Sequence, residues 1–175
     1  RERLETLPWI RAASIEREFP GTIRVKILER RPMALWQREN KLVLVDDEGV
    51  EITSRNLERF RDLLVVVGKD APTHAASLMA ILANEPALKQ RVNAAVRVGD
   101  RRWNIRMDNG VYVRLPETAP KAAWQRFARL EREHELLKQD LLSIDLRIPD
   151  QLIVRTRSGR QGPDRKVSHR KGKNT

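Results

Sequence analysis

Apolar and polar residues alternate along residues 14–27, and this period of two residues is typical of β-strands. Residues 22–27 would form a half-buried strand and residues 14–17 the strand before it. Pro20-Gly21 lies between the two strands and supplies the turn. One face would carry Ile23, Val25 and Ile27, and the other Thr22, Arg24 and Lys26. A short helical stretch over residues 4–10 is expected before this hairpin.

A second alternating pattern covers residues 42–45 and 50–52, on either side of the loop 46–49. The register that keeps the apolar side chains on one face predicts the pairs Val45–Val50 and Val43–Ile52. The acidic loop lacks the ligand spacing of a calcium-binding loop, so we interpret it as a hairpin tip.

Residues 103–115 form the clearest hairpin. A three-residue loop, residues 108–110, keeps the apolar side chains on one face, with Gly110 left-handed in a bulge. The expected pairs are Met107–Val111, Ile105–Val113 and Trp103–Leu115. We expect Trp103 to be a core or core-edge residue, and Trp124 likewise.

The remaining patterns predict helices and further strands. The apolar run 63–67 indicates a strand buried on both faces. Thr73 is placed to cap a helix that runs to about Ala83, and Pro86 opens a shorter one. Pro120 opens the longest helix, predicted to reach about Leu142, with His134 partly buried at the core edge. Its apolar stripe is Ala123, Phe127, Leu130, Leu137 and Leu141. Two short strands are expected around Pro149-Asp150.

The stretch ILERRPMALW, residues 27–36, interrupts the strand pattern with charges and a proline. Pro32 cannot donate a hydrogen bond to a strand ladder, so it ends the first strand pair or lies at a sheet edge. We interpret this stretch as a hinge between two domains.

Composition narrows the possible functions. The 175 residues suit one or two domains, and the absence of cysteine excludes disulfides, cysteine-ligated zinc and thiol catalysis. The net charge is +11, but residues 155–175 carry eight Lys or Arg against one acid, a net of +7. This segment has almost no apolar residues, so we predict a disordered basic tail over residues 157–175.

No reaction chemistry is apparent in the sequence. None of the three histidines has a second metal ligand three or four residues after it, and no phosphate loop or nucleophile elbow is present. We therefore predict no catalytic residue, no metal site and no cofactor. A basic nucleic-acid-binding domain remains the alternative, although the tail has cations without aromatic side chains to stack on bases.

The stretch LPWIRAASIEREFPGTIRVKILERRPMALW resembles the FtsQ/DivIB family of bacterial cell-division proteins. The matching residues are Leu7, Pro8, Trp9, Arg17, Pro20, Glu29, Arg30, Pro32, Ala34 and Trp36. Phe19 stands where many members have Trp. LVLVDDEG and IDLRIPDQLIV are similar to later segments of the family.

The resemblance implies an α+β fold. Residues 1–33 would be the C-terminal part of a POTRA domain, without its first strand and first helix. Residues 34–156 would form a β domain of one twisted, mainly antiparallel sheet packed on helices. The domain junction would include Glu29, Arg30, Pro32 and Trp36.

The resemblance also implies a function: a non-catalytic scaffold of the division machinery. Such proteins bind FtsB (DivIC in some bacteria) and FtsL, mainly through the terminal strands of the β domain. Other membrane proteins of the division machinery are further expected partners of this chain, and a nucleic acid is not. An N-terminal span absent from this chain would anchor the protein in the inner (plasma) membrane, with this part outside the cytoplasm. The implied partner-binding residues are Arg147, Ile148, Leu152, Ile153, Val154 and Arg155. Ile148 and Thr156 fall where well-known members have aromatic residues.

Overall fold

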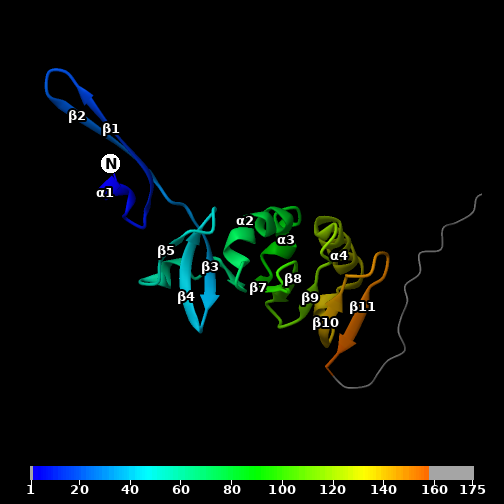
Figure 1. Ribbon diagram of the computed structural model, residues 1–175. Coiled ribbons are helices and arrows are strands. Elements are labelled where there is room, and N and C mark those ends of the chain that lie inside the picture. Colours follow the sequence, from blue (N-terminus) through cyan, green and yellow to red (C-terminus); the bar gives the residue numbers. More distant parts are fainter. Residues whose placement is uncertain (1, 158–175) are drawn as a thin grey trace, which may run out of the picture.

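The computed structural model describes residues 2–157, which form two separate sheets (Figure 1). The first sheet is a hairpin of β1 (Ile10–Glu18) and β2 (Thr22–Glu29), preceded by the single helical turn α1 (Glu2–Glu5). The second has nine strands in the order β11-β10-β9-β8-β7-β6-β3-β4-β5. Five of its eight strand pairings are antiparallel, so the predicted α+β class with one mainly antiparallel sheet is confirmed.

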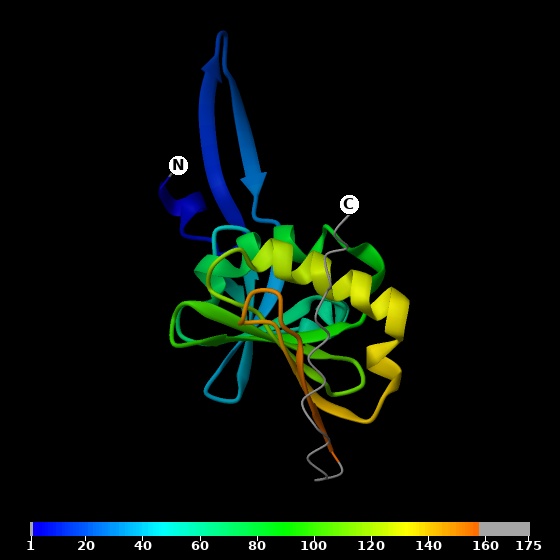
Figure 2. The same ribbon diagram turned by 90° about the vertical axis from the view of Figure 1, so that its right-hand side faces the viewer.

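The large sheet is built from short strands, and three of its strand pairings are parallel. Its strands are β3 (Pro32–Arg38), β4 (Lys41–Asp46), β5 (Glu51–Thr53), β6 (Leu64–Val67), β7 (Val92–Val98), β8 (Arg102–Met107), β9 (Tyr112–Arg114), β10 (Leu141–Asp145) and β11 (Ile153–Thr156). Parallel neighbours need a crossover connection. Helices α2 (Ala71–Leu82) and α3 (Pro86–Lys89) connect β6 to the parallel strand β7, and α4 (Pro120–His134) connects β9 to β10. Figure 2 shows these helices lying together on one side of the sheet.

Two apolar clusters hold the sheet. The larger one lies between the sheet and the helices, and it includes the buried side chains of Trp103, Trp124 and Phe127. Trp103 and Trp124 are thus core residues, as predicted. The smaller one is built on Leu35, Leu44 and Ile52 and is covered by side chains of the 3-10 helix η1 (Leu57–Phe60) and its flanks.

The predicted hairpins are largely confirmed because their turns are encoded locally. Strands β1 and β2 pair over the Pro20-Gly21 turn. Strands β8 and β9 pair Ile105 with Val113, and the Met107 amide donates to the Val111 carbonyl as the three-residue loop requires. Gly110 has φ +83°. The run 63–67 provides β6, which lies inside the sheet between β3 and β7.

The long helix is shorter than predicted. Helix α4 ends at His134, because Glu135 adopts φ 48° and turns the chain into the 3-10 helix η2 (Leu136–Lys138). Leu137 is therefore buried beyond the helix, and Leu141 begins β10. The prediction for His134 is also wrong, since its side chain is 53% exposed.

Two other predicted elements differ from the structure, and one strand was not predicted. The residue before α2 is Asp70, and Thr73 lies inside its first turn. The first helical turn is Glu2–Glu5 and not residues 4–10, because the chain turns at residues 6–9. Strand β7 was not predicted, since its sequence VNAAVRV has small and polar residues in place of a clear alternation.

The register of the second hairpin is also different. Val45 pairs with Glu51 and Leu44 with Thr53, with an irregularity between them. The cause is Asp46, whose carboxylate accepts hydrogen bonds from the amides of Glu48 and Val50 and draws the loop inward. Asp46 is fully buried, so it does not lie at an exposed tip.

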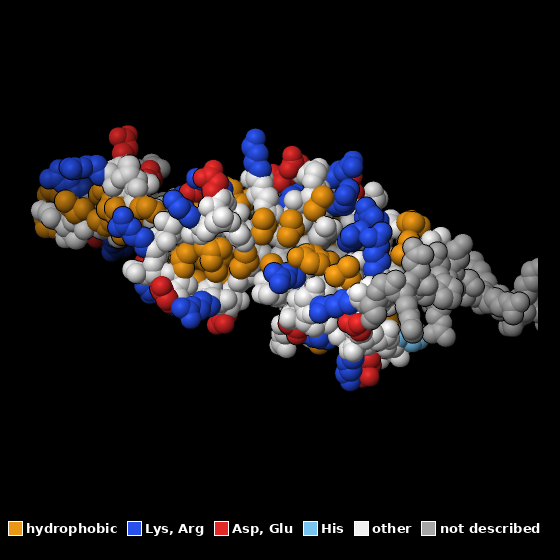
Figure 3. All heavy atoms as spheres, turned by 90° about the horizontal axis from the view of Figure 1, so that it is seen from below, with side chains coloured by type: hydrophobic (Ala, Val, Ile, Leu, Met, Phe, Trp, Pro, Cys, Tyr) orange, Lys and Arg blue, Asp and Glu red, His pale blue; other side chains and the backbone are white. Residues whose placement is uncertain are grey.

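The first hairpin carries an uncovered apolar face. Every residue of β2 is exposed, so the predicted half-buried strand is wrong for this chain. Ile15, Val25 and Ile27 are each about half exposed. Apolar side chains are visible along the projecting hairpin in Figure 3.

Gly49 and Gly110 provide a matched test of backbone constraint, since both have φ near +80°. An added Cβ at Gly110 would meet the Arg157 side chain at 3.3 Å, whereas at Gly49 it would lie 2.7 Å from the Pro72 backbone. Gly110→Ala should cost about 1–2 kcal/mol for the left-handed conformation. Gly49→Ala should cost about 1–3 kcal/mol more through overpacking. Denaturant unfolding measures both, and equal losses would contradict the close approach at Gly49.

Candidate partner-binding edge and domain junction

Strand β11 forms one edge of the nine-stranded sheet. It pairs with β10 on one side, and no strand within residues 2–157 pairs with its other side. All four of its residues are exposed, including Ile153 and Val154. An exposed apolar edge is a template for pairing with another chain.

Hydrogen bonding identifies the outward-facing backbone groups. The Arg157 amide donates to the Asp140 carbonyl at 3.2 Å, so it faces β10. Backbone groups on one strand of an antiparallel pair face the neighbour at every second residue. The irregularity in this ladder lies at residue 142 on β10, so the alternation along β11 is undisturbed. The amides of Arg155 and Ile153 therefore face β10, and the amide of Val154 faces outward.

The loop between β10 and β11 carries Arg147 and Ile148 to the surface. Arg147 makes a bidentate ion pair with Asp145, with a shortest distance of 2.6 Å between Nη2 and Oδ2. Arg126 of α4 donates to the carbonyls of Leu146 and Gln151, one at each end of the loop. Ile148 remains 45% exposed. The loop is thus fixed at its base and exposed at its tip.

The ion pair of Asp145 shifts both of its groups. Burial alone would raise the pKa of Asp145, but hydrogen bonds from the Arg147 side chain and amide outweigh it and hold the pKa below its ordinary value of 3.8. The same hydrogen bond raises the pKa of Arg147. Asp145 therefore stays ionised and fixes the direction of the Arg147 guanidinium.

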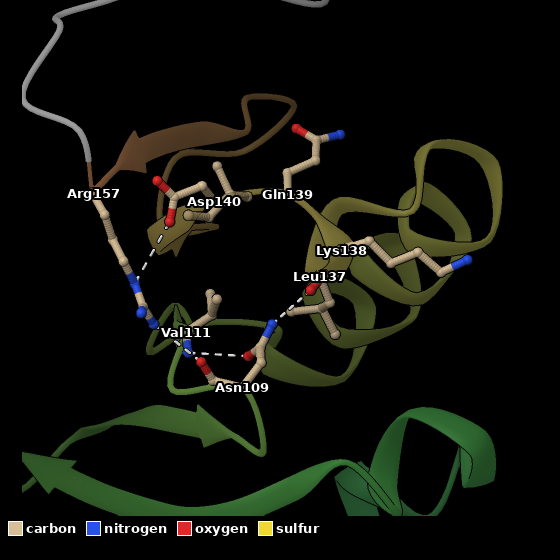
Figure 4. A pocket seen from close by; sticks show the side chains of 8 residues that line it. Asn109, Val111, Leu137, Lys138, Gln139, Asp140 and Arg157 are labelled. Atoms are coloured by element: carbon tan, nitrogen blue, oxygen red, sulfur yellow. Dashed lines mark hydrogen bonds and ion pairs between the residues drawn. The ribbon is translucent and has the colours of Figure 1, made fainter.

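A hollow of about 330 Å³ lies at the end of β11 (Figure 4). Arg157 reaches across it, donating to the Asn109 carbonyl at 3.0 Å, with Nε 4.0 Å from the Asp140 carboxylate. Asn109 in turn donates from its side chain to the Leu137 carbonyl. These contacts attach the end of the edge strand to the β8–β9 loop.

The other predicted binding residues divide between core and surface. Leu152 is partly buried against the larger core cluster, so it anchors the start of β11. Arg155 is exposed, and within the described residues it has no ion-pair partner. The structure thus brings Arg147, Ile148, Ile153, Val154 and Arg155 to one exposed region, and turns Leu152 inward.

Three of the four predicted junction residues lie where the two sheets meet, and Trp36 lies inside the large sheet. Glu29 ends β2, Pro32 begins β3, and Arg30 between them forms an ion pair with Asp46 at 2.6 Å. Trp36 is buried in β3, and its Nε1 donates to the Gly68 carbonyl. Sequence reasoning missed Asp46, Arg126 and Asp145. Asp46 and Arg126 bond to groups distant in sequence, and the pair of Asp145 with Arg147 depends on the loop geometry that the fold sets.

Two further observations concern residues 2–157 alone. No group of three or more His, Cys, Asp or Glu side chains in this part of the chain could hold a metal ion. None of its helices combines the length and the apolar composition needed to cross a membrane. The predicted disordered tail begins at the end of this part, and residues 158–175 lie outside it.

The fold and its edge define a class: an α+β protein in which a small hairpin unit precedes a large sheet with an open last strand. Residues 34–147 match the family described as cell division protein FtsQ/DivIB, C-terminal, and residues 1–30 match the POTRA domain of FtsQ type. The chain belongs to the FtsQ/DivIB family of cell-division proteins.

Individual relatives agree with the family match. The chain is 37% identical to the cell division protein FtsQ of Bradyrhizobium diazoefficiens over 88% of this chain and 45% of the relative. It is 38% identical to FtsQ of Rickettsia felis over 84% of this chain and 55% of the relative. The chain thus spans about half the length of these relatives. A solved extracytoplasmic domain of DivIB from Geobacillus stearothermophilus aligns with a TM-score of 0.41 and 14% identity, over 62% of this chain and 96% of that chain.

Replacing Asp145 by Asn should lower the free energy of unfolding by about 1–2 kcal/mol at pH 7, because Arg147 and Arg114 lose a charged acceptor. Since the pKa of Asp145 is depressed on folding, its stabilisation is present above pH 3.8 and is lost as the pH falls below that value. The variant and the wild type should therefore converge in acid.

Denaturant titration at several pH values measures this convergence. Asp62→Asn is the matched control, because Asp62 is exposed and forms no ion pair within residues 2–157. That control should change stability by less than about 1 kcal/mol. A loss in Asp145→Asn that is independent of pH would show that the charge of Asp145 is not responsible.

Proposed function

We propose that this chain is a non-catalytic scaffold module of the division machinery that binds a partner strand at β11. The observation that carries the proposal is the open edge, with Val154's amide directed outward and apolar side chains on both faces of the strand. Addition of a strand to such an edge supplies backbone hydrogen bonds, while side-chain pockets and charges supply specificity.

The proposed partners are FtsB (DivIC in some bacteria) and FtsL. Membership of the FtsQ/DivIB family supports a role in division. Arg155 at the edge and Arg147 beside it suit a partner segment with acidic residues, since complementary charges direct association. The module would act outside the cytoplasm, on a protein anchored by a span in the inner membrane.

The proposed domain division follows the two sheets. Residues 1–33 form the later part of a POTRA domain, and residues 34–156 form the β domain. The uncovered apolar face of the hairpin supports this division, because Ile15, Val25 and Ile27 are arranged as one face of a larger sandwich. The first strand and helix expected of a complete POTRA domain would cover that face.

Val154→Pro tests the edge directly. Proline lacks the outward amide, and it is tolerated at an edge position whose N–H does not face the neighbouring strand. We expect affinity for the FtsB–FtsL pair to fall about tenfold or more, since an unpaired buried acceptor costs about 1–3 kcal/mol. Calorimetry measures binding, and circular dichroism and melting should remain unchanged. Val154→Ala removes the side chain but keeps the amide, so it should bind more tightly than the proline variant.

Full-strength binding by folded Val154→Pro would place the interface elsewhere. Unfolding of the proline variant, with the alanine variant stable, would show that residue 154 is part of the internal ladder.

Arg155→Glu tests the charge of the edge. Reversal of an exposed interface charge should slow association, and the deficit should shrink as salt is added. The matched control is Lys41→Glu on β4, which reverses an exposed charge near the opposite edge of the sheet. Surface plasmon resonance at several salt concentrations measures both rates. Equal effects of the two reversals would indicate that only the net charge matters.

A further inference from the structure

The covalent connection between the two sheets is very short. Strand β2 ends at Glu29 and β3 begins at Pro32, so only residues 30 and 31 join the hairpin to the large sheet. Figures 1 and 2 show the hairpin projecting away from the sheet and its helices. A two-residue connection without further contacts would act as a hinge, as the sequence predicts.

The centre of the junction is a buried ion pair. Asp46 is fully buried, and its Oδ2 accepts a hydrogen bond from Arg30 Nη1 at 2.6 Å. Its Oδ1 accepts from the amides of Glu48 and Val50 at 3.0 and 2.8 Å. Both oxygens of Asp46 are therefore occupied, and a buried charge that loses its partner is strongly unfavourable.

Arg30 is held from both sides of the junction. Its guanidinium bonds to Asp46 in the large sheet, and its amide donates to the Trp9 carbonyl in the hairpin unit at 2.8 Å. Rotation of the hairpin about residues 30 and 31 would break one of these two bonds.

Two more contacts cross the junction at different places. Arg11 of β1 pairs with Asp47 and Glu48 in the loop after β4. The Trp9 ring lies 6.2 Å from the Phe60 ring in η1. Each contact is exposed and weak alone, but the two engage separate segments of the large domain. A pivot about one segment would break the contact at the other.

The loop 46–49, which Arg11 and Arg30 contact, packs against helix α2. Gly49 lies so close to the first turn of α2 that an added Cβ would be 2.7 Å from the Pro72 backbone. Asp46, Asp47 and Glu48 therefore cannot follow the hairpin if it moves, because the loop is packed against the helix.

We propose that residues 30 and 31 form a rigid joint in which Arg30 and Asp46 are positioning residues that set the direction of the hairpin relative to the large sheet. The joint would present the hairpin and the β11 edge at one fixed geometry. This inference does not depend on what binds at β11.

Pulsed electron double resonance tests the joint in the chain. Because the chain has no cysteine, two introduced cysteines carry the only spin labels. Ser14→Cys on β1 and Gln125→Cys on α4 are exposed positions on either side of the joint. A rigid joint gives a single narrow distance distribution, and a hinge gives a broad one. A broad distribution in the otherwise unchanged protein would overturn the proposal without any further variant.

Asp46→Asn then tests the ion pair. Asparagine keeps an oxygen for the Glu48 and Val50 amides but turns an NH₂ group toward the Arg30 guanidinium, so it breaks the bond across the joint selectively. The distribution should lose its single narrow maximum, and Asp46→Asn combined with Arg30→Met should broaden it no further than either change alone. An unchanged distribution in Asp46→Asn would overturn the proposal.

Two controls distinguish loss of the rigid joint from a general increase in the mobility of the protein. Lys26→Gln breaks the Lys26–Glu16 pair, which lies within the hairpin, and should leave the distribution narrow. A second label pair, Ser54→Cys and Gln125→Cys, lies within the large domain and should keep its distribution in Asp46→Asn. Broadening of that second pair would show that Asp46 holds the large domain together and does not act at the joint, which would also overturn the proposal.

Discussion

The carboxylate of Asp46 must be paired, because it is fully buried in a domain whose other buried residues are almost all apolar. The loop that begins at Asp46 supplies the first partners, because the amides of Glu48 and Val50 donate to one carboxylate oxygen. The other oxygen needs a cation, which Arg30 supplies from the connection to the hairpin. The buried carboxylate of Asp46 thus couples the conformation of the β4–β5 turn to the docking of the hairpin.

The two edge strands of the large sheet, β5 and β11, differ in length and in the side chains that they expose. Strand β5 has three residues, and its charged Glu51 is paired with Arg38 of β3. A short edge strand that carries a charge limits pairing with another chain. Strand β11 has consecutive apolar residues at its edge, and Arg126 and Arg157 hold its ends in place through carbonyl oxygens. A fixed open edge loses less conformational entropy when a strand is added than a flexible one. The sheet therefore has a short charged edge at β5 and an open apolar edge at β11.

Local signals predicted the hairpins and the order of most elements, since a turn such as residues 108–110 fixes its own register. The errors occurred where a distant contact decides the structure. Asp46 was interpreted as a tip residue because its partner Arg30 lies 16 positions earlier, and the register of β4 and β5 changed with it. Strand β7 has no strong pattern of its own and exists because β6 and β8 pair with it on both sides. The open edge was predicted from its position as the last strand, whereas the outward direction of the Val154 amide required the ladder itself.

The proposed joint and the β11 edge are connected through the helices of the large sheet. Helix α4 leads directly into η2 and β10, so the position of the edge is fixed by packing of α4 on the core. The hairpin is fixed to the loop after β4, and that loop is braced by the first turn of α2. Because α2 and α4 pack against each other on the same side of the sheet, one helical layer connects the two ends of the molecule. With the proposed joint, this helical layer would keep the hairpin and β11 in one relative orientation.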